Sequence, residues 1–441
     1  MHRTAVLGAV ALALAACADT DSASDTTLQP SPSSVTTAAP VTTSAPVTTA
    51  ASVTTAASVT TAASVSTAVP VTTAATTAGS PDGAGPDQPP GTVVAAEPLA
   101  EPVGAAGTKA WRISYVSTSV DGEPVEVTGM VLAPPGEAPP GGRPVLAWAH
   151  GTTGLADGCA PSARGAGELA ALFAPMLADG YVVAATDYEG LGGPGLHPYL
   201  VGGSEGRSVL DAVRAATSLP EAGARPESLI WGFSQGGHAA LWAGQLAAGY
   251  APTIDLLGVI AAAPASLVGE RPATNLGGTD PTAGFLPMIV GGYAAGYDDV
   301  DPAAYLTPAA LDRLDVIGQG CVQEVFETYA DLSIAEMIRP EAWSGPGGTV
   351  AGPLGARLAE NEPGGSAIAA PVLIVQGTTD EVVPPAGPTS IARRLCATGT
   401  IVDLRLYDGA GHAGVNLASL PDVLAFARER RAGTEPASTC P

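Results

Sequence analysis

The most informative stretch of this sequence places a serine between two glycines at a sharp turn. In Gly232-Phe233-Ser234-Gln235-Gly236, the serine follows the apolar run 228–231 and precedes the small-residue run 235–248, which we expect to be a strand and a helix. A serine in this context is typical of a nucleophile elbow. Side chains two residues either side of it would collide across the turn, which explains the glycines. We expect Ser234 to be a catalytic nucleophile; the alternative is a glycine-rich turn without a catalytic role.

An acid and a base follow two later strand-like runs. Asp380 comes just after the apolar run 371–376, and His412 comes just after the run 400–407. A nucleophile, an acid and a base in this order, each beyond a strand, are typical of the α/β-hydrolase fold. In that arrangement His412 would take the proton of Ser234. Asp380 would hold the correct imidazole tautomer and stabilise its charged form.

Other residues of the same types are weaker candidates. Glu381 and Asp408 lie near the right loops, but Asp380 is closest to the end of its strand. The remaining histidines lack the favoured position after the last strand, and they are His2, His150, His197 and His238.

The loop after an earlier strand could supply hydrogen-bond donors to a developing oxyanion. The apolar run 144–149 leads into His150-Gly151-Thr152-Thr153-Gly154. In α/β-hydrolases one oxyanion N–H comes from such a loop, and the other comes from the residue after the nucleophile. We assign the donors to Thr152 and Gln235, with Thr153 as the alternative to the first. We expect His150 to orient the loop.

A second group of polar residues follows the strand predicted at 181–186. Asp187 and Glu189 come directly after it, and His197 follows in a His-Pro-Tyr-Leu sequence. Two acids and a histidine could indicate a metal site, but their spacing matches no known ligand motif. We therefore expect a structural loop near the mouth of the site, and no metal.

The remaining apolar periodicity predicts the elements that must position these residues. Alternating runs at 111–119 and 125–133, joined by Asp121-Gly122, predict a β-hairpin. Further elements are strands at 144–149, 181–186, 228–231, 256–263, 371–376 and 400–407, and helices at 165–177, 208–217, 235–248 and 391–396. Strands and helices that alternate in this way predict an α/β fold, a mostly parallel sheet with helices on both faces.

Residues 270–369 interrupt this alternation, because they contain only helical pieces broken by glycine and proline. Chains do not leave so long a segment structureless inside a compact domain, so we expect an inserted helical cap. Its most apolar patch is 285–290 with Tyr293 and Tyr297. We expect the patch, Phe285 and Met288 included, to form the core of the cap and to line an acyl-binding cleft over the serine. Gly291-Gly292 is a candidate hinge for lid opening.

The N-terminus has the features of an export signal. Arg3 precedes an apolar run at 5–16 that is too short to span a membrane. The run ends in Leu14-Ala15-Ala16-Cys17, which resembles the lipobox of bacterial lipoproteins, where the cysteine is acylated and becomes the new N-terminus. We expect a signal peptide at 1–16 and a lipid anchor on Cys17. The alternative is an ordinary secretory signal, and both export the protein.

Residues 17–92 are expected to be a disordered tether of the kind formed by Ser/Thr/Pro-rich stalks, which can carry O-linked glycans. Valine recurs every six residues from Val41 to Val71, and no aromatic residue occurs between Asp19 and Gly91. With almost nothing large to bury, this repeat is not expected to form a β-helix. The α/β-hydrolase domain is expected at 93–441, with the cap at 270–369 inserted within it.

The charge balance argues against two classes of partner. The chain has 42 acidic and 18 basic side chains, and its formal net charge is −24. Such a charge disfavours binding to nucleic acid or to an anionic membrane surface. No obligate protein partner is evident. We expect contact with the membrane only through the anchor on Cys17.

The cysteines other than Cys17 are expected to form disulfides, because an exported chain with an even number of them favours pairing. They are Cys159, Cys321, Cys396 and Cys440, which allow three connectivities. We favour Cys159–Cys321, which would connect the segment after the oxyanion loop to the cap. The other pair, Cys396–Cys440, would hold the C-terminal tail to the last crossover helix.

Four motifs together resemble the secretory lipase family of the α/β-hydrolases. They lie at 149–154, 187–192, 197–200 and 232–237, within a resemblance that covers roughly 108–426. The resemblance implies hydrolysis of carboxylic esters, triacylglycerol or simpler esters as substrate, a helical lid and no cofactor. The N-terminus departs from this pattern, because a lipoprotein signal and a long stalk indicate an anchored enzyme where the family name implies a released one.

Three other functions remain as alternatives. An acyltransferase acting on envelope lipids would share every catalytic residue and differ only in its acceptor. A serine peptidase of the prolyl-oligopeptidase type would share the order of the triad, but it would carry a large N-terminal domain, which 20–92 cannot form. A non-catalytic adhesin on a hydrolase scaffold is disfavoured because Ser234, Asp380, His412 and the oxyanion loop are all present.

Overall fold

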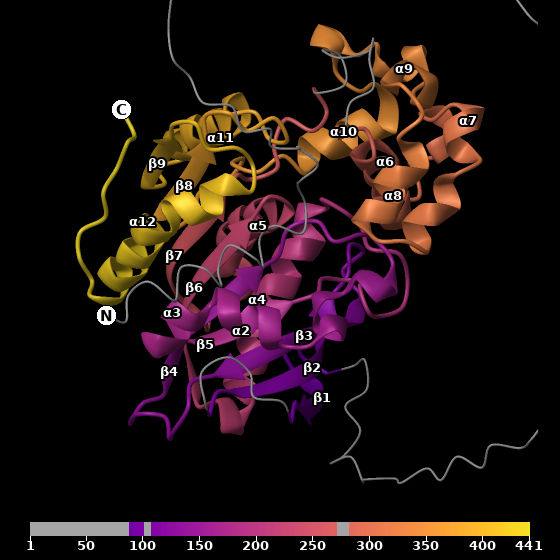
Figure 1. Cartoon of the computed structure of the whole chain (residues 1–441). Coiled ribbons are helices and arrows are strands. Elements are labelled where there is room, and N and C mark those ends of the chain that lie inside the picture. Colours follow the sequence, from indigo (N-terminus) through magenta and orange to yellow (C-terminus); the bar gives the residue numbers. More distant parts are fainter. Residues whose placement is uncertain (1–87, 101–106, 271–281) are drawn as a thin grey trace, which may run out of the picture. The chain divides into compact units, whose positions relative to one another are not determined.

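The structure is a computed structural model that describes residues 88–100, 107–270 and 282–441. The predicted signal peptide, the predicted anchor on Cys17 and the predicted tether up to residue 87 lie outside the described residues. The described strands form one nine-stranded sheet in the order β1-β2-β3-β5-β4-β6-β7-β8-β9. Figure 1 shows this sheet with helices packed around it.

The sheet is antiparallel at one end and parallel over the rest. The antiparallel strands are β1 (Val93–Pro98), β2 (Lys109–Thr118) and β3 (Pro124–Ala133), and β3 also pairs antiparallel with β5 (Val182–Thr186). The parallel part consists of β5, β4 (Arg143–Ala149), β6 (Ala224–Phe233), β7 (Asp255–Ala262), β8 (Val372–Gly377) and β9 (Val402–Tyr407). Every predicted strand is present, and β1 is added at the edge.

Helices cover both faces of this sheet (Figure 1). One face is covered by three helices that share one core cluster, α4 (Gly202–Ser218), α5 (Gln235–Tyr250) and α11 (Ala386–Ala397). The opposite face is covered by α2 (Gly167–Leu172), α3 (Ala174–Ala178) and α12 (Gly414–Arg431). β4 and β8 are buried at every residue because both of their faces are covered, which is why they read as continuous apolar runs. The predicted α/β-hydrolase fold is confirmed.

The start of α4 corrects the sequence prediction, which placed a helix only at 208–217. α4 begins at Gly202, where an added Cβ would lie 2.1 Å from the indole of Trp242. A Cβ on Gly206 would lie 2.8 Å from the main chain of the facing helix. These glycines therefore serve close packing of α4 against α5 and do not break the helix. As a result, Glu205 belongs to a buried helical turn.

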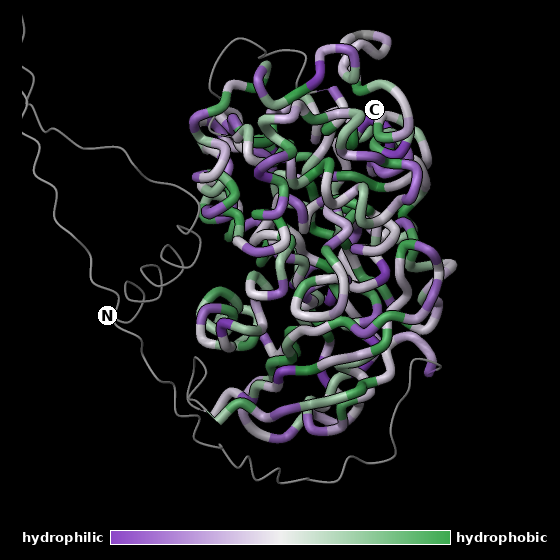
Figure 2. Tube along the Cα trace, turned by 90° about the vertical axis from the view of Figure 1, so that its right-hand side faces the viewer, coloured by the Kyte–Doolittle hydropathy of each residue, from purple (hydrophilic) through white to green (hydrophobic). Residues whose placement is uncertain are grey.

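Between β7 and β8 the chain forms the predicted helical segment. The described residues there contain no named strand, and their α-helices are α6 (Phe285–Gly296), α7 (Pro308–Leu311), α8 (Val322–Tyr329), α9 (Ile334–Met337) and α10 (Gly352–Glu360). Their buried side chains form a core cluster of their own. Figure 1 shows these helices gathered together, and Figure 2 shows apolar and hydrophilic stretches alternating along the trace. None of the helices in the described ranges is long and apolar enough to cross a membrane.

The two glycines proposed as a hinge have a packing role in α6. A Cβ on Gly291 would lie 2.1 Å from the Ile317 side chain, and a Cβ on Gly292 would lie 2.7 Å from the main-chain nitrogen of Tyr199. At Gly292 the neighbour is main chain, so no side chain fits there, whereas a side chain at Gly291 would have to displace the tip of Ile317. Both glycines lie inside the helix. Packing accounts for them, and the hinge interpretation finds no support.

A disulfide between Cys159 and Cys321 connects the cap to the segment after β4, which is the pairing that the sequence analysis favours. Gly154 and Cys321 also form an isolated antiparallel bridge. The Val322 N–H donates to the Thr153 carbonyl at 3.0 Å. The cap is therefore attached to the predicted oxyanion loop by one covalent bond and by main-chain hydrogen bonding.

The second disulfide, Cys396–Cys440, holds the C-terminal tail along β9 at the edge of the sheet. The Thr439 N–H donates to the Val402 carbonyl at 2.7 Å, and the Thr439 hydroxyl accepts the Leu404 N–H at 2.9 Å. The tail thus occupies backbone groups that an edge strand would otherwise expose.

Removing the Cys396–Cys440 bridge should lower the stability of the domain. The two cysteines are 44 residues apart in sequence. In the chain-entropy model, a bridge closing a loop of this size contributes about 4 kcal/mol. We expect the Cys396→Ser/Cys440→Ser variant to unfold at a lower urea concentration than the wild type. Non-reducing peptide mapping of the wild type should recover the two cysteine peptides joined, and a peptide joining Cys159 to either of them would contradict the structure.

Candidate active site

Ser234 lies at a turn that demands glycine on both sides. It follows β6 with φ of 57° and ψ of −117°, a positive-φ conformation that is strained for a residue with a Cβ. A Cβ on Gly232 would lie 1.8 Å from the Gly236 carbonyl oxygen, and a Cβ on Gly236 would lie 1.8 Å from the Ala149 carbonyl oxygen. No side chain fits at either glycine, which gives this turn the geometry of a nucleophile elbow.

The side chains of Ser234, His412 and Asp380 form a hydrogen-bonded chain. His412 Nε2 lies 3.0 Å from Ser234 Oγ, and His412 Nδ1 lies 2.8 Å from Asp380 Oδ2. Because a carboxylate only accepts hydrogen bonds, Nδ1 carries the proton and Nε2 is left to accept from the serine hydroxyl. The three residues follow β6, β9 and β8, whose carboxyl ends meet at one edge of the sheet.

The carboxylate of Asp380 is held in place by several donors. Oδ1 accepts the N–H groups of Val382 and Val383 at 2.9 and 2.7 Å, and Oδ2 accepts the side-chain amide of Gln376 at 3.0 Å. Asp380 is only 4% exposed. These bonds fix the orientation of the carboxylate that faces His412, so its direction is set before any substrate binds.

The predicted oxyanion donors lie at the N-terminus of α5 and in the adjacent loop. Gln235 is the first residue of α5, so its N–H has no carbonyl partner one turn earlier within the helix. The loop after β4 lies beside this helix end, because Gly236 packs directly on the Ala149 carbonyl. Within the loop, Thr152 Oγ1 is 2.8 Å from the Tyr199 hydroxyl. We retain Thr152 and Gln235 as the assigned donors.

His150 is buried, and its two ring nitrogens contact two different loops, the loop after β4 and the loop after β5. Nδ1 lies 2.7 Å from the Gly151 carbonyl oxygen, and Nε2 lies 3.4 Å from that of Asp187. The Tyr188 ring is 4.5 Å from the imidazole, and the Tyr188 hydroxyl donates to the His150 carbonyl at 2.9 Å. Burial lowers the pKa of His150. These contacts are of the kind expected of a residue that orients the loop.

The polar side chains of the loop after β5 bond to neighbouring segments. Asp187 accepts the Ser162 N–H at 2.9 Å and the Thr128 hydroxyl at 2.7 Å. Glu189 accepts the Ser204 hydroxyl. These are structural uses of the two acids, as we expected for this loop.

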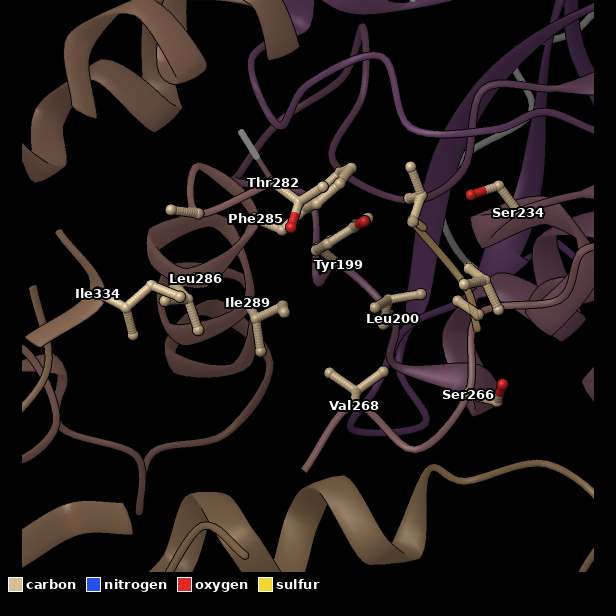
Figure 3. A pocket seen from close by; sticks show the side chains of 14 residues that line it. Tyr199, Leu200, Ser234, Ser266, Val268, Thr282, Phe285, Leu286, Ile289 and Ile334 are labelled. Carbon is tan, nitrogen blue, oxygen red and sulfur yellow. The ribbon is translucent and has the colours of Figure 1, made fainter. Parts of the chain in front are cut away.

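An apolar cavity lies beside Ser234 and extends to the cap. It encloses about 730 Å³, its open mouth included. Residues that line it include Leu200 and Val383 near the sheet, and Phe285, Leu286, Ile289 and Ile334 in the cap. Figure 3 shows Leu200 and Tyr199 between Ser234 and the side chains of α6. With apolar walls and the serine at one end, the cavity is suited to a hydrocarbon chain.

The predicted apolar patch is right in part. Phe285 lines the cavity as expected, together with Leu286 and Ile289. Met288 does not line it, because it is fully buried in the core of the cap. A helix turns by about 100° per residue, so one face of α6 meets the cavity while Met288 points elsewhere. Tyr293 likewise packs in the core of the cap.

A buried carboxylate beneath the elbow joins residues from several segments. Glu205, in the first turn of α4, is 0% exposed. Its Oε1 accepts the Gln235 side-chain amide at 2.8 Å and the Leu200 N–H at 3.0 Å. Its Oε2 lies 3.0 Å from His238 Nδ1. His197 Nε2 lies 2.7 Å from the same Gln235 amide nitrogen.

The hydrogen-bond partners of His238 assign it a positive charge. Its Nε2 lies 2.7 Å from the Asn361 carbonyl oxygen, while Nδ1 faces Glu205. Both partners only accept, so both ring nitrogens must donate. Burial alone would lower the pKa of His238, but the hydrogen bond to Glu205 and its negative charge raise it. Burial alone would raise the pKa of Glu205, yet its hydrogen bonds and the positive charge of His238 lower it to about 2.

Sequence reasoning missed Glu205, and it left His197 and His238 without a place in the site. Both histidines are buried within this cluster, His197 at 0% and His238 at 3% exposure. Nothing in the sequence distinguishes Glu205 from a surface acid such as Glu221. Its burial follows from the contact between α4 and α5, which the glycines of α4 permit.

The model of the secretory lipase family matches residues 168–439. Secreted triacylglycerol lipase LIP7 of Malassezia globosa is 29% identical over 277 residues, which cover 60% of this chain and 57% of that protein. The chain therefore spans little more than half of the length of this relative.

Two further proteins are similar to this chain over a larger share of both sequences. A protein of Mycobacterium tuberculosis described as probable inactive lipase MT1628 is 26% identical over 345 residues, 74% of each chain. Among solved structures, lipase A of Candida antarctica superposes with a TM-score of 0.68 at 22% identity, covering 80% of this chain and 84% of that one. At this identity the structural similarity shows the fold alone.

The Glu205–His238 pair should make stability depend on pH in a defined way. The pKa of His238 is raised above its ordinary value of 6.5, so the stability from its charged form is complete below 6.5 and is lost as pH rises through the raised pKa. The pKa of Glu205 falls from 4.5 to about 2, so its contribution is complete above 4.5 and is lost towards pH 2. The combined contribution of the two groups to the free energy of unfolding is therefore largest between pH 4.5 and pH 6.5.

Urea unfolding of the wild type and of His238→Gln at two pH values measures this effect. We expect the difference in unfolding free energy between the two proteins to be larger at pH 5.5 than at pH 9, because the variant has no charge to lose. A difference that is the same at both pH values would show that His238 is not charged in the folded protein.

Proposed function

The chain belongs to the secretory lipase family, and we propose that it hydrolyses carboxylic esters through an acyl-enzyme on Ser234. The observation that carries the proposal is the hydrogen-bonded chain from Ser234 through His412 to Asp380, with the serine at an apolar cavity. Family membership alone would not carry it, since one relative is described as a probable inactive lipase. The proposal therefore rests on the constellation of side chains in this chain.

In the proposed mechanism, Ser234 Oγ attacks the acyl carbon while His412 Nε2 takes its proton. Asp380 keeps the proton on Nδ1 and stabilises the imidazolium that forms. The main-chain N–H groups of Thr152 and Gln235 donate to the oxyanion. His412 then gives its proton to the leaving alcohol, and a water molecule activated by the same imidazole releases the carboxylic acid and restores the serine.

The cavity supports an ester whose acyl part is a hydrocarbon chain. Its walls in the cap are the side chains of Phe285, Leu286, Ile289 and Ile334. An acyl chain placed there would have its carbonyl carbon at Ser234 and its tail against α6 and α9. The relative named as a secreted triacylglycerol lipase supports triacylglycerol as one substrate of this kind. No cofactor takes part in the proposed reaction.

We propose that the enzyme is exported and held at the cell envelope. The signal at 1–16 would be removed, and Cys17 would carry the lipid anchor. Residues 17–92 would tether the α/β-hydrolase domain at 93–441, whose cap is inserted at 270–369. The relative named as a secreted lipase supports export, and the Leu-Ala-Ala-Cys sequence supports the anchor.

Replacing the nucleophile or the base should abolish turnover. Ser234→Ala and His412→Ala should lower kcat to a similar level, and the double variant should add little, because the two residues act as a unit. Asp380→Asn should keep the fold and lower kcat by about 10⁴-fold, because the amide favours the wrong imidazole tautomer. Hydrolysis of p-nitrophenyl butyrate, with circular dichroism to verify folding, measures these effects.

The matched control is Asp408→Asn. Asp408 lies in the exposed loop before His412, and its carboxylate accepts the Thr378 hydroxyl. This variant should retain activity. A peptide amide and an alcohol acceptor assayed in parallel identify a peptidase or an acyltransferase. Near wild-type ester hydrolysis by Ser234→Ala would refute the assignment of the nucleophile.

Filling the cavity should select against long acyl chains. Ile289→Trp places a large side chain on the α6 face that lines the cavity. We expect kcat/KM for p-nitrophenyl palmitate to fall by about tenfold or more relative to the acetate, because the tail loses its space. Val316→Trp is the control, since Val316 is half-buried in the cap but does not line the cavity. An equal loss on both esters in a folded Ile289→Trp protein would assign Ile289 to packing only.

A further inference from the structure

The mechanism above leaves one fully buried carboxylate on the site side of α4 without a role. Glu205 is held by three groups from outside its own helix, namely the Gln235 amide, the Leu200 N–H and the His238 imidazolium. A buried charge costs free energy unless it is paired, and here His238 supplies the pair.

The Gln235 side chain is held in a single orientation. Its Nε2 lies 2.8 Å from Glu205 Oε1 and 2.7 Å from His197 Nε2. His197 Nδ1 lies 2.7 Å from the Glu189 carbonyl oxygen, so Nδ1 carries the ring proton and Nε2 accepts. If the Gln235 amide were turned by 180°, its oxygen would face Glu205 Oε1 and His197 Nε2, which are both acceptors. The two hydrogens of one amide group therefore fix the Gln235 side chain at both sides.

Fixing this side chain also restrains the Gln235 main chain at the start of α5. Its backbone follows directly on Ser234, whose N–H donates to the Ala262 carbonyl and whose carbonyl accepts the N–H groups of His238 and Ala265. The Gln235 side chain adds a further attachment to this turn. The Gln235 N–H is the donor assigned to the oxyanion. A donor that moves by a fraction of an ångström loses much of its effect on a transition state, because the oxyanion demands a defined distance and direction.

The same carboxylate reaches the wall of the cavity. Leu200 lines the cavity and has a φ of 60°, a conformation that needs support from its surroundings. Its N–H donates to Glu205 Oε1 at 3.0 Å, and its carbonyl accepts the hydroxyl of Tyr293 on α6 at 3.0 Å. Glu205 thus bonds at one oxygen to both the elbow and the cavity wall.

The partner of Glu205 leads to the cap. His238 donates to the main-chain carbonyl of Asn361, at the C-terminal end of α10. The Asn361 side chain accepts the Gly202 N–H at 2.8 Å and donates to the Tyr297 hydroxyl at 2.8 Å. The buried pair therefore joins α4 to the elbow helix and is connected to the cap through Asn361.

We propose that Glu205 is a positioning residue for the oxyanion hole, acting through the Gln235 side chain. It fixes the Gln235 N–H at the place where negative charge develops, and it takes no part in proton transfer. The inference rests on the proposed function, because an oxyanion forms only if Ser234 attacks an acyl group. It assigns to the Glu205–His238 pair an effect on kcat beyond its effect on stability.

Gln235→Ala is the first test, since it removes the anchor while leaving the main-chain donor and the Glu205–His238 pair in place. We expect kcat for p-nitrophenyl butyrate to fall by about ten- to a hundredfold with KM changed less than about threefold, because the donor acts on the transition state and not on the bound ester. The affinity for a trifluoromethyl ketone inhibitor, which forms a tetrahedral adduct, should fall in parallel with kcat/KM.

Glu205→Ala and the double variant Glu205→Ala/Gln235→Ala complete a cycle. If Glu205 acts through Gln235, adding Glu205→Ala to Gln235→Ala should lower kcat little further. If Glu205 has a separate structural role, the two losses in kcat should add. Glu205→Gln should restore most of the kcat lost in Glu205→Ala, because its amide oxygen can still accept from Gln235 and its NH₂ can donate to a neutral His238.

The matched control is Asp211→Asn. Asp211 is a fully buried carboxylate on the same helix as Glu205, and it accepts hydrogen bonds from Ser117, Arg214 and Tyr250, away from the elbow. The variant should lose stability and keep kcat. An unchanged kcat in Gln235→Ala, or fully additive losses in the cycle, would overturn the proposal. Should Glu205→Ala not fold, Gln235→Ala and Glu205→Gln decide the matter alone. A wild type that cleaves no ester would instead refute the proposed function, and the inference with it.

Discussion

The arrangement of the site depends on one steric constraint, the closeness of the elbow to the end of β4. Gly236 packs so tightly on the Ala149 carbonyl that a Cβ would lie 1.8 Å from it, and Gly232 is equally close to Gly236. The first contact sets the distance between the N-terminus of α5 and the loop that holds Thr152. The second permits the sharp turn in which Ser234 has a positive φ. The positions of Ser234 and of the two assigned N–H donors therefore depend on the close packing that this pair of glycines permits.

This constraint is also why much of the site could be predicted from the sequence. The glycine spacing marks the elbow, and parallel strands place Asp380 and His412 at the same edge of the sheet once each is known to follow a strand. These are short-range features, since each depends on a few consecutive residues. The α/β fold and the helical nature of the segment between β7 and β8 followed from similar local patterns. The two disulfide pairs did not, because the cysteine count allows three connectivities and the favoured one was a choice among them.

What could not be predicted depends on how helices pack. Gly202 and Gly206 read as helix breakers in isolation, yet they let α4 approach α5, and that approach buries Glu205 against Gln235 and His238. The face that α6 turns towards the cavity depends in the same way on its rotation, which separates Phe285 from Met288 although both belong to one apolar patch. Composition gives the apolarity of a helix, whereas only tertiary contacts give its rotation.

The same contacts make the cap part of the site and not a cover laid over it. Cys321 binds it covalently to the segment after β4, Tyr293 holds the carbonyl of the cavity-lining Leu200, and Asn361 accepts a hydrogen bond from His238 on the elbow helix. Each attachment ends within a few residues of a group assigned to catalysis or substrate binding. A displacement of the cap as a rigid body would therefore disturb the loop, the cavity wall and the buried ion pair together. Fixed attachment of this kind favours a preorganised oxyanion hole, because the donors are then held by residues on both sides of the cavity.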